Sequence, residues 1–377
     1  MNMNDDFLKS MKDAFELLRT KGPGEATAAV QRALAGDNPQ APRTQTGRAP
    51  QAPHMPPSAS QWSQAWAQAQ AHLNPNVSNV SAPASAPPTF DAETPGTFST
   101  HTFSNGAGQR QYKLYVPAAY RGEPLPLIVM LHGCTQNADD FAAGTRMNEM
   151  AERQGFIVVY PNQPHTANHS ACWNWFKPSD QLRDHGEPSL IAGITREVMT
   201  HYRVDAARVY VAGLSAGGAM ADIMLKTWPD LYAAACVHSG LASGCAKDLP
   251  SALAAMKGGK ALRDRVRAAP QRPLIVFHGD ADKTVHPSNA ADLLAAFNAS
   301  TTTVGAPGAM SSAPNGSRGA TLQRLVASNG VEAESWSIHG AGHAWAGGSP
   351  RGSYTDPRGP DATAEMLRFF LAHPRRD

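Results

Sequence analysis

The sequence lacks a large excess of either charge. Lys and Arg number 33 and Asp and Glu 31 in 377 residues, which leaves a formal net charge of +2. Such a balanced chain has no broad positive field for holding a nucleic-acid backbone or an anionic lipid surface. It also lacks any apolar run of the roughly 18 residues needed to cross a bilayer. We therefore expect neither nucleic-acid binding nor a membrane span.

Two further signals are missing. The N-terminal stretch MNMNDDFLKSMKDAFELLRTKG has no basic start, apolar middle and small-residue cleavage site, so the sequence alone predicts a cytoplasmic protein. No CxxC spacing occurs, which argues against a zinc site. Cysteine is scarce, with four residues: Cys134, Cys172, Cys236 and Cys245. Their number leaves disulfides and buried free thiols both open.

Composition divides the chain into three parts. Residues 1–35 are predicted to form an amphipathic helical segment, because apolar side chains recur there at helical spacing: Leu8, Met11, Phe15 and Leu18. Residues 36–95 are rich in Pro, Ala, Gln and Ser and are predicted to be a flexible linker, since they offer little apolar surface to bury. Residues 96–377 alternate β and α segments and are predicted to form the catalytic domain.

Within residues 96–377, the strands are expected to be apolar throughout. We expect strands at 110–117, 125–133, 156–161, 208–213, 232–240, 273–280 and 332–340, and helices at 138–155, 189–202, 288–299 and 362–373, with another directly after Ser215. Continuous apolar runs indicate strands covered on both faces. The predicted fold class is therefore α/β, with a mostly parallel central sheet flanked by helices, and function is expected at the carboxyl ends of its strands.

A serine lies between two glycines at one of these strand ends. The stretch Gly213-Leu214-Ser215-Ala216-Gly217 matches G-x-S-x-G and has the required strand before it and helix after it. A turn this sharp strains the serine backbone, and side chains at the flanking positions would collide with neighbouring chain. We therefore interpret Ser215 as a nucleophile.

A serine nucleophile needs a base oriented by a carboxylate, in the chain order Ser, acid, His. Asp280 and Asp282 both follow a predicted strand, and the spacing from the strand does not choose between them. We favour Asp282 as the acid, because Asp280 is placed to close the turn through backbone amides. For the base we favour His343, which follows Gly342 in a loop, over His339, which ends a strand directly.

The third requirement is an oxyanion hole made of backbone N–H groups. The amide of Ala216, after the nucleophile, is one expected donor. The loop LHGCTQN follows an early strand, and the amide of Cys134 is the expected second donor, with Thr135 as its neighbour. His132 in the same loop is expected to shape the loop rather than to act as a second base.

Several blocks in order resemble a known family. The stretches LHGCTQNADDFAAGTRMNEMAERQGFIVVYPNQ, CWNWF, GEPSLIAGITREV, VYVAGLSAGGAM, HGDADKTVHPSNA and GAGHAWAGG are similar to those of the poly(3-hydroxybutyrate) depolymerase family of esterases. These esterases are relatives of feruloyl and acetylxylan esterases and have the α/β-hydrolase fold. The resemblance implies Ser215 as nucleophile, Asp282 as acid and His343 as base. It also implies that CWNWF frames the site, with Trp173 and Trp175 as substrate-binding residues; ordinary packing is the alternative for both.

These observations predict a serine hydrolase that cleaves carboxylic esters through an acyl-enzyme. The resemblance implies short 3-hydroxybutyrate-type esters or oligomers as substrates, with feruloyl or acetylxylan-type esters as the alternative. An alternative of another class is a binding module tethered to a granule or a protein partner through residues 1–35. No metal or organic cofactor is expected. Secreted members of the family imply an extracellular location, against the cytoplasmic one expected from the N-terminus.

Overall fold

The computed structural model describes residues 95–259, 270–297, 300–305 and 317–376. The helical segment predicted for residues 1–35 and the linker predicted for residues 36–95 fall outside these ranges, apart from residue 95. The three predicted catalytic residues, Ser215, Asp282 and His343, all lie within them.

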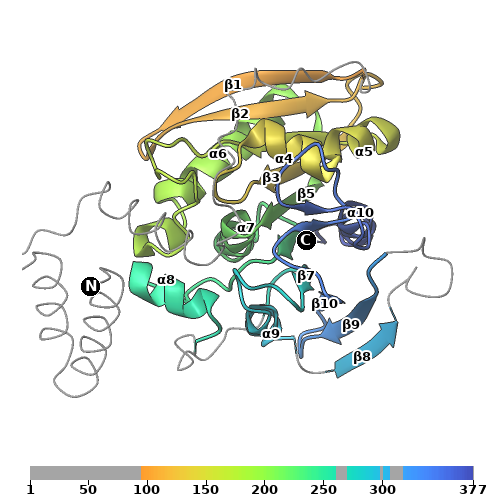
Figure 1. Ribbon diagram of the computed structural model, residues 1–377. Helices are drawn as coiled ribbons and strands as arrows, with labels where there is room; N and C mark the ends of the chain where they lie inside the picture. The colour runs from red at the N-terminus through yellow and green to blue at the C-terminus, as the bar shows by residue number, and fades with distance from the viewer. Residues whose placement is uncertain (1–94, 260–269, 298–299, 306–316, 377) are drawn as a thin grey trace, which may run out of the picture. The chain divides into compact units, whose positions relative to one another are not determined.

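The described residues form a large sheet of ten strands (Figure 1). In sheet order these are β1 (Thr97–Asn105), β2 (Gly108–Val116), β4 (Ile157–Pro161), β3 (Leu125–Leu131), β5 (Val204–Leu214), β6 (Ala234–His238), β7 (Leu274–Gly279), β10 (Glu332–Ile338), β9 (Ala320–Val326) and β8 (Ser300–Gly305). The six central strands from β4 to β10 run parallel, whereas β1, β2, β9 and β8 pair antiparallel at the two edges. The carboxyl ends of the six parallel strands therefore lie along one edge of the sheet.

Helices cover both faces of this sheet. They are α4 (Ala138–Thr145), α5 (Met147–Gln154), α6 (Gly186–His201), α7 (Ala216–Thr227), α8 (Leu249–Met256), α9 (Ser288–Leu294) and α10 (Ala362–Ala372). Successive residues of β3 point to opposite sides, so that Val129 packs in the core shared with α6 to α9, and Met130 packs in the core shared with α4, α5 and α10. Two buried faces explain the uninterrupted apolar strands, and the predicted α/β-hydrolase type of fold is confirmed. No helix in the described ranges is long and apolar enough to span a bilayer.

The predicted helix at 138–155 was wrong in one respect, because the structure divides it into α4 and α5. Arg146, between them, has a left-handed backbone with φ of 56°. Its guanidinium reaches the carboxylate of Asp361 at 2.6 Å and the carbonyl of Gly347, so a tertiary contact accompanies the break. The expected end at Gly155 is confirmed, since this glycine has φ of 73° and its amide caps the helix.

Several elements of the structure were not predicted from the sequence. They comprise β1, β8, β9, α8, a 3₁₀ turn at Pro178–Gln181 and a small parallel pair, β11 (Trp345–Ala346) with β12 (Thr355–Asp356). The predicted helix at 288–299 ends earlier, at Leu294. The pair β11 and β12 lies close to the candidate site, because β11 begins two residues after His343.

Candidate active site

Ser215 occupies the turn between β5 and α7. Its φ of 57° and ψ of −117° lie outside the ordinary regions for a residue with a side chain. The turn is held because the Ser215 amide donates a hydrogen bond of 2.9 Å to the carbonyl of His238 at the end of β6. Ser215 is partly exposed, whereas its neighbours Leu214 and Ala216 are buried. Such strain is characteristic of a residue that the fold holds in place for function.

The glycines around Ser215 allow strand and helix to approach closely. A β carbon on Gly213 would lie 2.3 Å from the carbonyl carbon of Gly217, and one on Gly217 would lie 2.0 Å from the carbonyl oxygen of Leu131. Backbone on both sides would clash with any side chain, so the G-x-S-x-G spacing is required by packing at this turn.

Asp282 and His343 come from separate loops and meet. His343 Nδ1 lies 2.7 Å from Asp282 Oδ2, although the two residues are 61 positions apart. The other carboxylate oxygen accepts hydrogen bonds from the amides of Thr284 and Val285 at 2.8 and 2.9 Å. Because a carboxylate only accepts, the proton of His343 belongs on Nδ1, which leaves Nε2 with a free lone pair.

Several contacts keep the Asp282 carboxylate ionised. Burial raises the pKa of this carboxyl, but the hydrogen bond and charge of His343 and the amide of Val285 outweigh burial, so the pKa lies below its ordinary value. A second histidine, His278, places Nε2 3.5 Å from Asp282 Oδ2 and donates to the carbonyl of Val285 at 2.9 Å. Asp282 is therefore a fixed negative charge behind His343.

The two residues considered as alternatives from the sequence, Asp280 and His339, make other contacts. Asp280 accepts a hydrogen bond of 2.6 Å from the amide of Gly340, 60 positions away, so its carboxylate joins two loops and does not close its own turn as predicted. His339 is exposed, and its Nε2 lies 2.9 Å from the hydroxyl of Thr321. Neither makes a contact with Ser215 or His343 among those the structure describes.

Sequence reasoning missed His238, which joins the serine turn to the histidine loop. Its carbonyl accepts from the Ser215 amide, and its Nε2 accepts a hydrogen bond of 3.1 Å from the amide of Ala346 in β11. The buried ring lies between those of Phe277 and Trp345, at centroid distances of 5.7 and 5.1 Å. Burial lowers the pKa of His238 to about 3, so the ring stays neutral and can accept. This role of His238 could be recognised only by knowing that the residue contacts both Ser215 and Ala346.

The two predicted oxyanion donors lie on adjacent segments. A β carbon built on Gly133 would lie 3.6 Å from the Ser215 β carbon, which places the loop after β3 against the serine turn. Within the described residues, no protein acceptor is bonded to the amide of Cys134 or of Ala216. Ala216 also begins α7, so the positive end of the helix dipole lies at this point. Both amides are free to bind an anionic oxygen.

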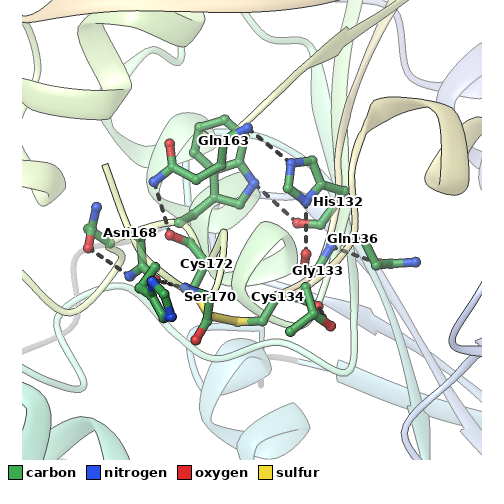
Figure 2. Close-up of a disulfide and its surroundings, with 12 residues drawn as sticks. His132, Gly133, Cys134, Gln136, Gln163, Asn168, Ser170 and Cys172 are labelled. Carbon is green, nitrogen blue, oxygen red and sulfur yellow. Dashed lines mark hydrogen bonds between the residues drawn. A yellow bond between two sulfur atoms is a disulfide. The ribbon is translucent and has the colours of Figure 1, made fainter. Parts of the chain in front are cut away.

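A disulfide between Cys134 and Cys172 fixes the loop after β3 (Figure 2). The neighbouring Thr135 amide donates to the carbonyl of Ser170 at 2.7 Å, so two bonds tie the loop to the segment before Trp173. Cys236 and Cys245 are free and buried. Of the choices left open by the sequence, the structure therefore has one disulfide and two free thiols.

His132 shapes this loop from below, as predicted. The fully buried ring accepts from the amide of Gln163 at Nε2, 3.1 Å away, and Nδ1 lies 2.8 Å from the carbonyl of Gly133 (Figure 2). Burial lowers its pKa to about 4. A neutral ring with the proton on Nδ1 satisfies both contacts.

Trp173 and Trp175 are buried, with exposed fractions of 0% and 3%. The Trp173 indole donates to the carbonyl of His132 at 3.1 Å, and its ring lies beside the His132 ring. Packing accounts for both tryptophans, which present little surface to a substrate in this arrangement. Their predicted substrate contact stays a prediction.

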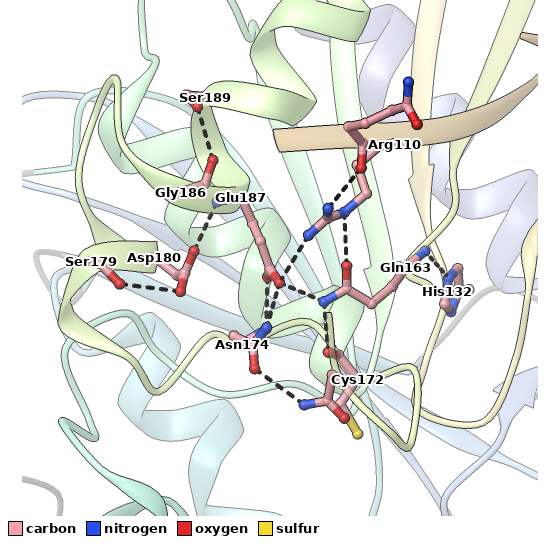
Figure 3. A network of polar contacts seen from close by, with 12 residues as sticks. Arg110, His132, Gln163, Cys172, Asn174, Ser179, Asp180, Gly186, Glu187 and Ser189 are labelled. Atoms are coloured by element: carbon pink, nitrogen blue, oxygen red, sulfur yellow. Dashed lines mark hydrogen bonds and ion pairs between the residues drawn. The ribbon is translucent and has the colours of Figure 1, made fainter. Parts of the chain in front are cut away.

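A buried carboxylate organises the segment that carries these tryptophans (Figure 3). Glu187 accepts hydrogen bonds from the Asn174 amide at 2.7 Å, from the Asn174 side chain at 2.6 Å and from the Gln163 side chain, and Arg110 lies 3.7 Å away. Burial raises the pKa of Glu187 to about 7, the charge of Asp180 adds to the rise, and the bonds from Asn174 and Gln163 oppose it. The network connects α6 to the loop after β3 through Gln163 and His132.

Comparison with known proteins identifies the family of the chain. The family described as esterase PHB depolymerase matches residues 110–317, a range that contains Ser215 and Asp282. A poly(3-hydroxyalkanoate) depolymerase C of Paucimonas lemoignei is 34% identical over 198 residues, covering 50% of this chain and 47% of the relative. A feruloyl esterase B of Neurospora crassa is 37% identical over 147 residues, covering 39% of this chain and 49% of the relative. The chain thus spans about half the length of these curated relatives.

A solved structure supports the fold. An acetyl xylan esterase from Aspergillus awamori superposes with a TM-score of 0.56 at 20% identity, covering 73% of this chain and 99% of that one. At this identity the likeness concerns the arrangement of strands and helices.

Proposed function

Because the chain belongs to the family of esterases described as PHB depolymerase, we propose that it hydrolyses carboxylic esters through an acyl-enzyme. Ser215 is the nucleophile, His343 the general base and Asp282 the carboxylate that orients it. The observation that carries the proposal is the hydrogen bond of 2.7 Å between Asp282 and His343, in a fold that also holds Ser215 on a strained turn.

In the first half of the reaction, the Ser215 hydroxyl attacks the ester carbonyl while His343 Nε2 takes its proton. Asp282 holds the tautomer and stabilises the imidazolium that forms. The amides of Cys134 and Ala216 donate to the oxygen that becomes negative in the tetrahedral intermediate. His343 then protonates the departing alkoxide, and the acyl group stays on Ser215.

In the second half, water takes the place of the alcohol. His343 removes a proton from the water, which attacks the acyl-enzyme carbonyl, and the same two amides hold the oxyanion. Collapse of this intermediate releases the acid and returns the proton to Ser215. Every step uses side chains or amides of this chain.

For the substrate, we favour short 3-hydroxybutyrate-type esters or oligomers. Support comes from the relative named poly(3-hydroxyalkanoate) depolymerase C and from the family match. Feruloyl-type esters are the second candidate, because the relative named feruloyl esterase B has a higher identity over its matched segment.

The test is a comparison of kcat/KM for 3-hydroxybutyrate dimer and trimer, methyl ferulate and p-nitrophenyl acetate, on the protein and on Ser215→Ala. We expect turnover of at least one ester, and a loss of about 10⁴-fold or more in kcat in the variant. Equal turnover by protein and variant would contradict the role of Ser215. A higher kcat/KM for methyl ferulate than for the hydroxybutyrate oligomers would favour the second candidate.

A further inference from the structure

An exposed aromatic side chain lies beside the candidate oxyanion loop. Tyr354 is 41% exposed, in a domain that buries most of its large apolar side chains. Its backbone has φ of 52°, which a residue with a side chain seldom adopts. An exposed aromatic ring loses the free energy that burial of its apolar surface would provide, and a left-handed backbone is energetically unfavourable for a residue with a side chain. Both features therefore need an explanation.

The segment that carries Tyr354 is fixed to α4 and not loose. The Ser353 amide donates to Asp140 Oδ1 at 2.8 Å, and the Ser353 hydroxyl to Asp140 Oδ2 at 2.6 Å. A β carbon on Gly352 would lie 2.5 Å from the backbone of Gly144, so this turn packs directly on the helix. Tyr354 therefore projects from a rigid support.

The same segment is bonded to the loop after β3. The Gln136 side chain accepts from the Gly133 amide at 2.9 Å and donates to the carbonyl of Ser353 at 3.1 Å. The Tyr354 hydroxyl lies 3.2 Å from the hydroxyl of Thr135, the residue after Cys134. The ring is thereby held at a defined distance from the candidate oxyanion donor.

A third attachment leads to the histidine loop. The carbonyl of Tyr354 accepts a hydrogen bond of 2.7 Å from the amide of Trp345, two residues after His343. Tyr354 is thus an exposed side chain whose residue is bonded both to the loop of Cys134 and to the loop of His343.

We propose that Tyr354 is a specificity-determining residue, whose ring binds the apolar body of the ester substrate next to the scissile carbonyl. A tyrosine ring offers large, stiff contact area at small entropic cost. Here the backbone is held through Trp345 and the neighbouring Ser353, and the hydroxyl lies beside that of Thr135. The ligand class is an ester with a group larger than acetyl on it. The proposal rests on the proposed function of the same site.

The experiment measures equilibrium binding in the Ser215→Ala background, where ester is not consumed. The ligands are 3-hydroxybutyrate trimer and methyl ferulate, with ethyl acetate as the small ester. Adding Tyr354→Ala is expected to raise the Kd of the better-bound large ester roughly three- to tenfold, as for loss of an aromatic contact. Tyr354→Phe, which keeps the ring and loses the contact with Thr135, is expected to bind within about twofold of the parent.

The matched control is Leu371→Ala, since Leu371 on α10 is exposed to a similar extent, 42%. It should leave every Kd unchanged. The proposal is overturned if Tyr354→Ala leaves the Kd of both large esters unchanged, if it weakens ethyl acetate as much, or if Tyr354→Phe weakens binding as much as Tyr354→Ala. Failure of the proposed function would give a different result, because the protein with Ser215 intact would then turn over no ester.

Discussion

At the scale of single residues, the choice between two neighbouring carboxylates decides the mechanism. Asp282 accepts hydrogen bonds from His343 Nδ1 and from two backbone amides, whereas Asp280 accepts one from the amide of Gly340. An asparagine at 282 would present an N–H that favours the wrong tautomer of His343. An asparagine at position 280 could still accept the hydrogen bond from the Gly340 amide through its side-chain oxygen.

We therefore expect Asp282→Asn to lower kcat by roughly 10³- to 10⁴-fold and Asp280→Asn to stay within a few-fold of the parent protein. Steady-state kinetics on one ester, with circular dichroism to verify folding, measures both. The assignment of the acid is wrong if Asp280→Asn is the inactive variant and Asp282→Asn turns over normally.

His238 gives a second prediction at this scale. His238→Phe keeps an aromatic ring between Phe277 and Trp345 but removes the acceptor for the buried amide of Ala346. We expect a loss of about 1–3 kcal/mol in the free energy of unfolding, with a lower kcat, because the strand after His343 loses an anchor. Urea denaturation and kcat measure these effects.

The control for His238 is the glutamine variant, whose side-chain oxygen can accept. His238→Gln should recover part of the kcat lost in His238→Phe. If His238→Phe has unchanged stability and unchanged kcat, the hydrogen bond to Ala346 does not position the histidine loop.

Residue type, a strand-turn-helix context and chain order selected Ser215 and restricted the other candidates to Asp280 or Asp282 and His339 or His343. The position of each residue in its loop and the family resemblance then favoured Asp282 and His343. His238 and Tyr354 could not be found in this way. Their roles depend on contacts with Ala346 and Thr135, more than 100 and 200 positions away, which no local pattern encodes.

At the scale of elements, the long apolar strands were predicted well from the sequence. Features that lie at contacts between distant parts of the chain were not. Strands such as β3 and β7 are buried throughout, so their apolar runs mark them in the sequence. The break between α4 and α5 occurs at Arg146, which contacts Asp361 across 215 positions, and β11 pairs with β12 in the chain that follows His343. Sequence periodicity carries no trace of either contact.

The buried Glu187, near the start of α6, gives a pH prediction at this scale. Its pKa is raised from 4.5 to about 7, so between these values the unfolded chain has released a proton that the folded protein retains. Unfolding then releases a proton, and the stability contributed by Glu187 is lost as the pH rises from about 4.5 through about 7. In Glu187→Gln this loss is absent.

The free energy of unfolding of Glu187→Gln, minus that of the parent, should therefore increase between about pH 5 and about pH 8. Urea denaturation at several pH values measures the difference. The exposed Glu123 supplies the matched variant, Glu123→Gln, which should give a flat difference over this range. A flat difference for Glu187→Gln as well would contradict the raised pKa.

At the scale of the whole molecule, the fold followed from alternating apolar strands and helices, which a buried parallel sheet requires. The substrate could not be predicted from the same pattern, because one fold and one catalytic geometry serve many esters. The granule or partner docking considered as an alternative for residues 1–35 concerns residues outside the described ranges and stays an alternative.

The central claim is that Ser215 is an activated nucleophile, and covalent labelling tests it most directly. A fluorophosphonate probe reacts with a serine only where a base and an oxyanion site activate its hydroxyl. We predict one equivalent of label, located on Ser215 by peptide mass spectrometry and absent in Ser215→Ala. Ester turnover that persists while Ser215 stays unlabelled, or equal labelling of the alanine variant, would contradict the account.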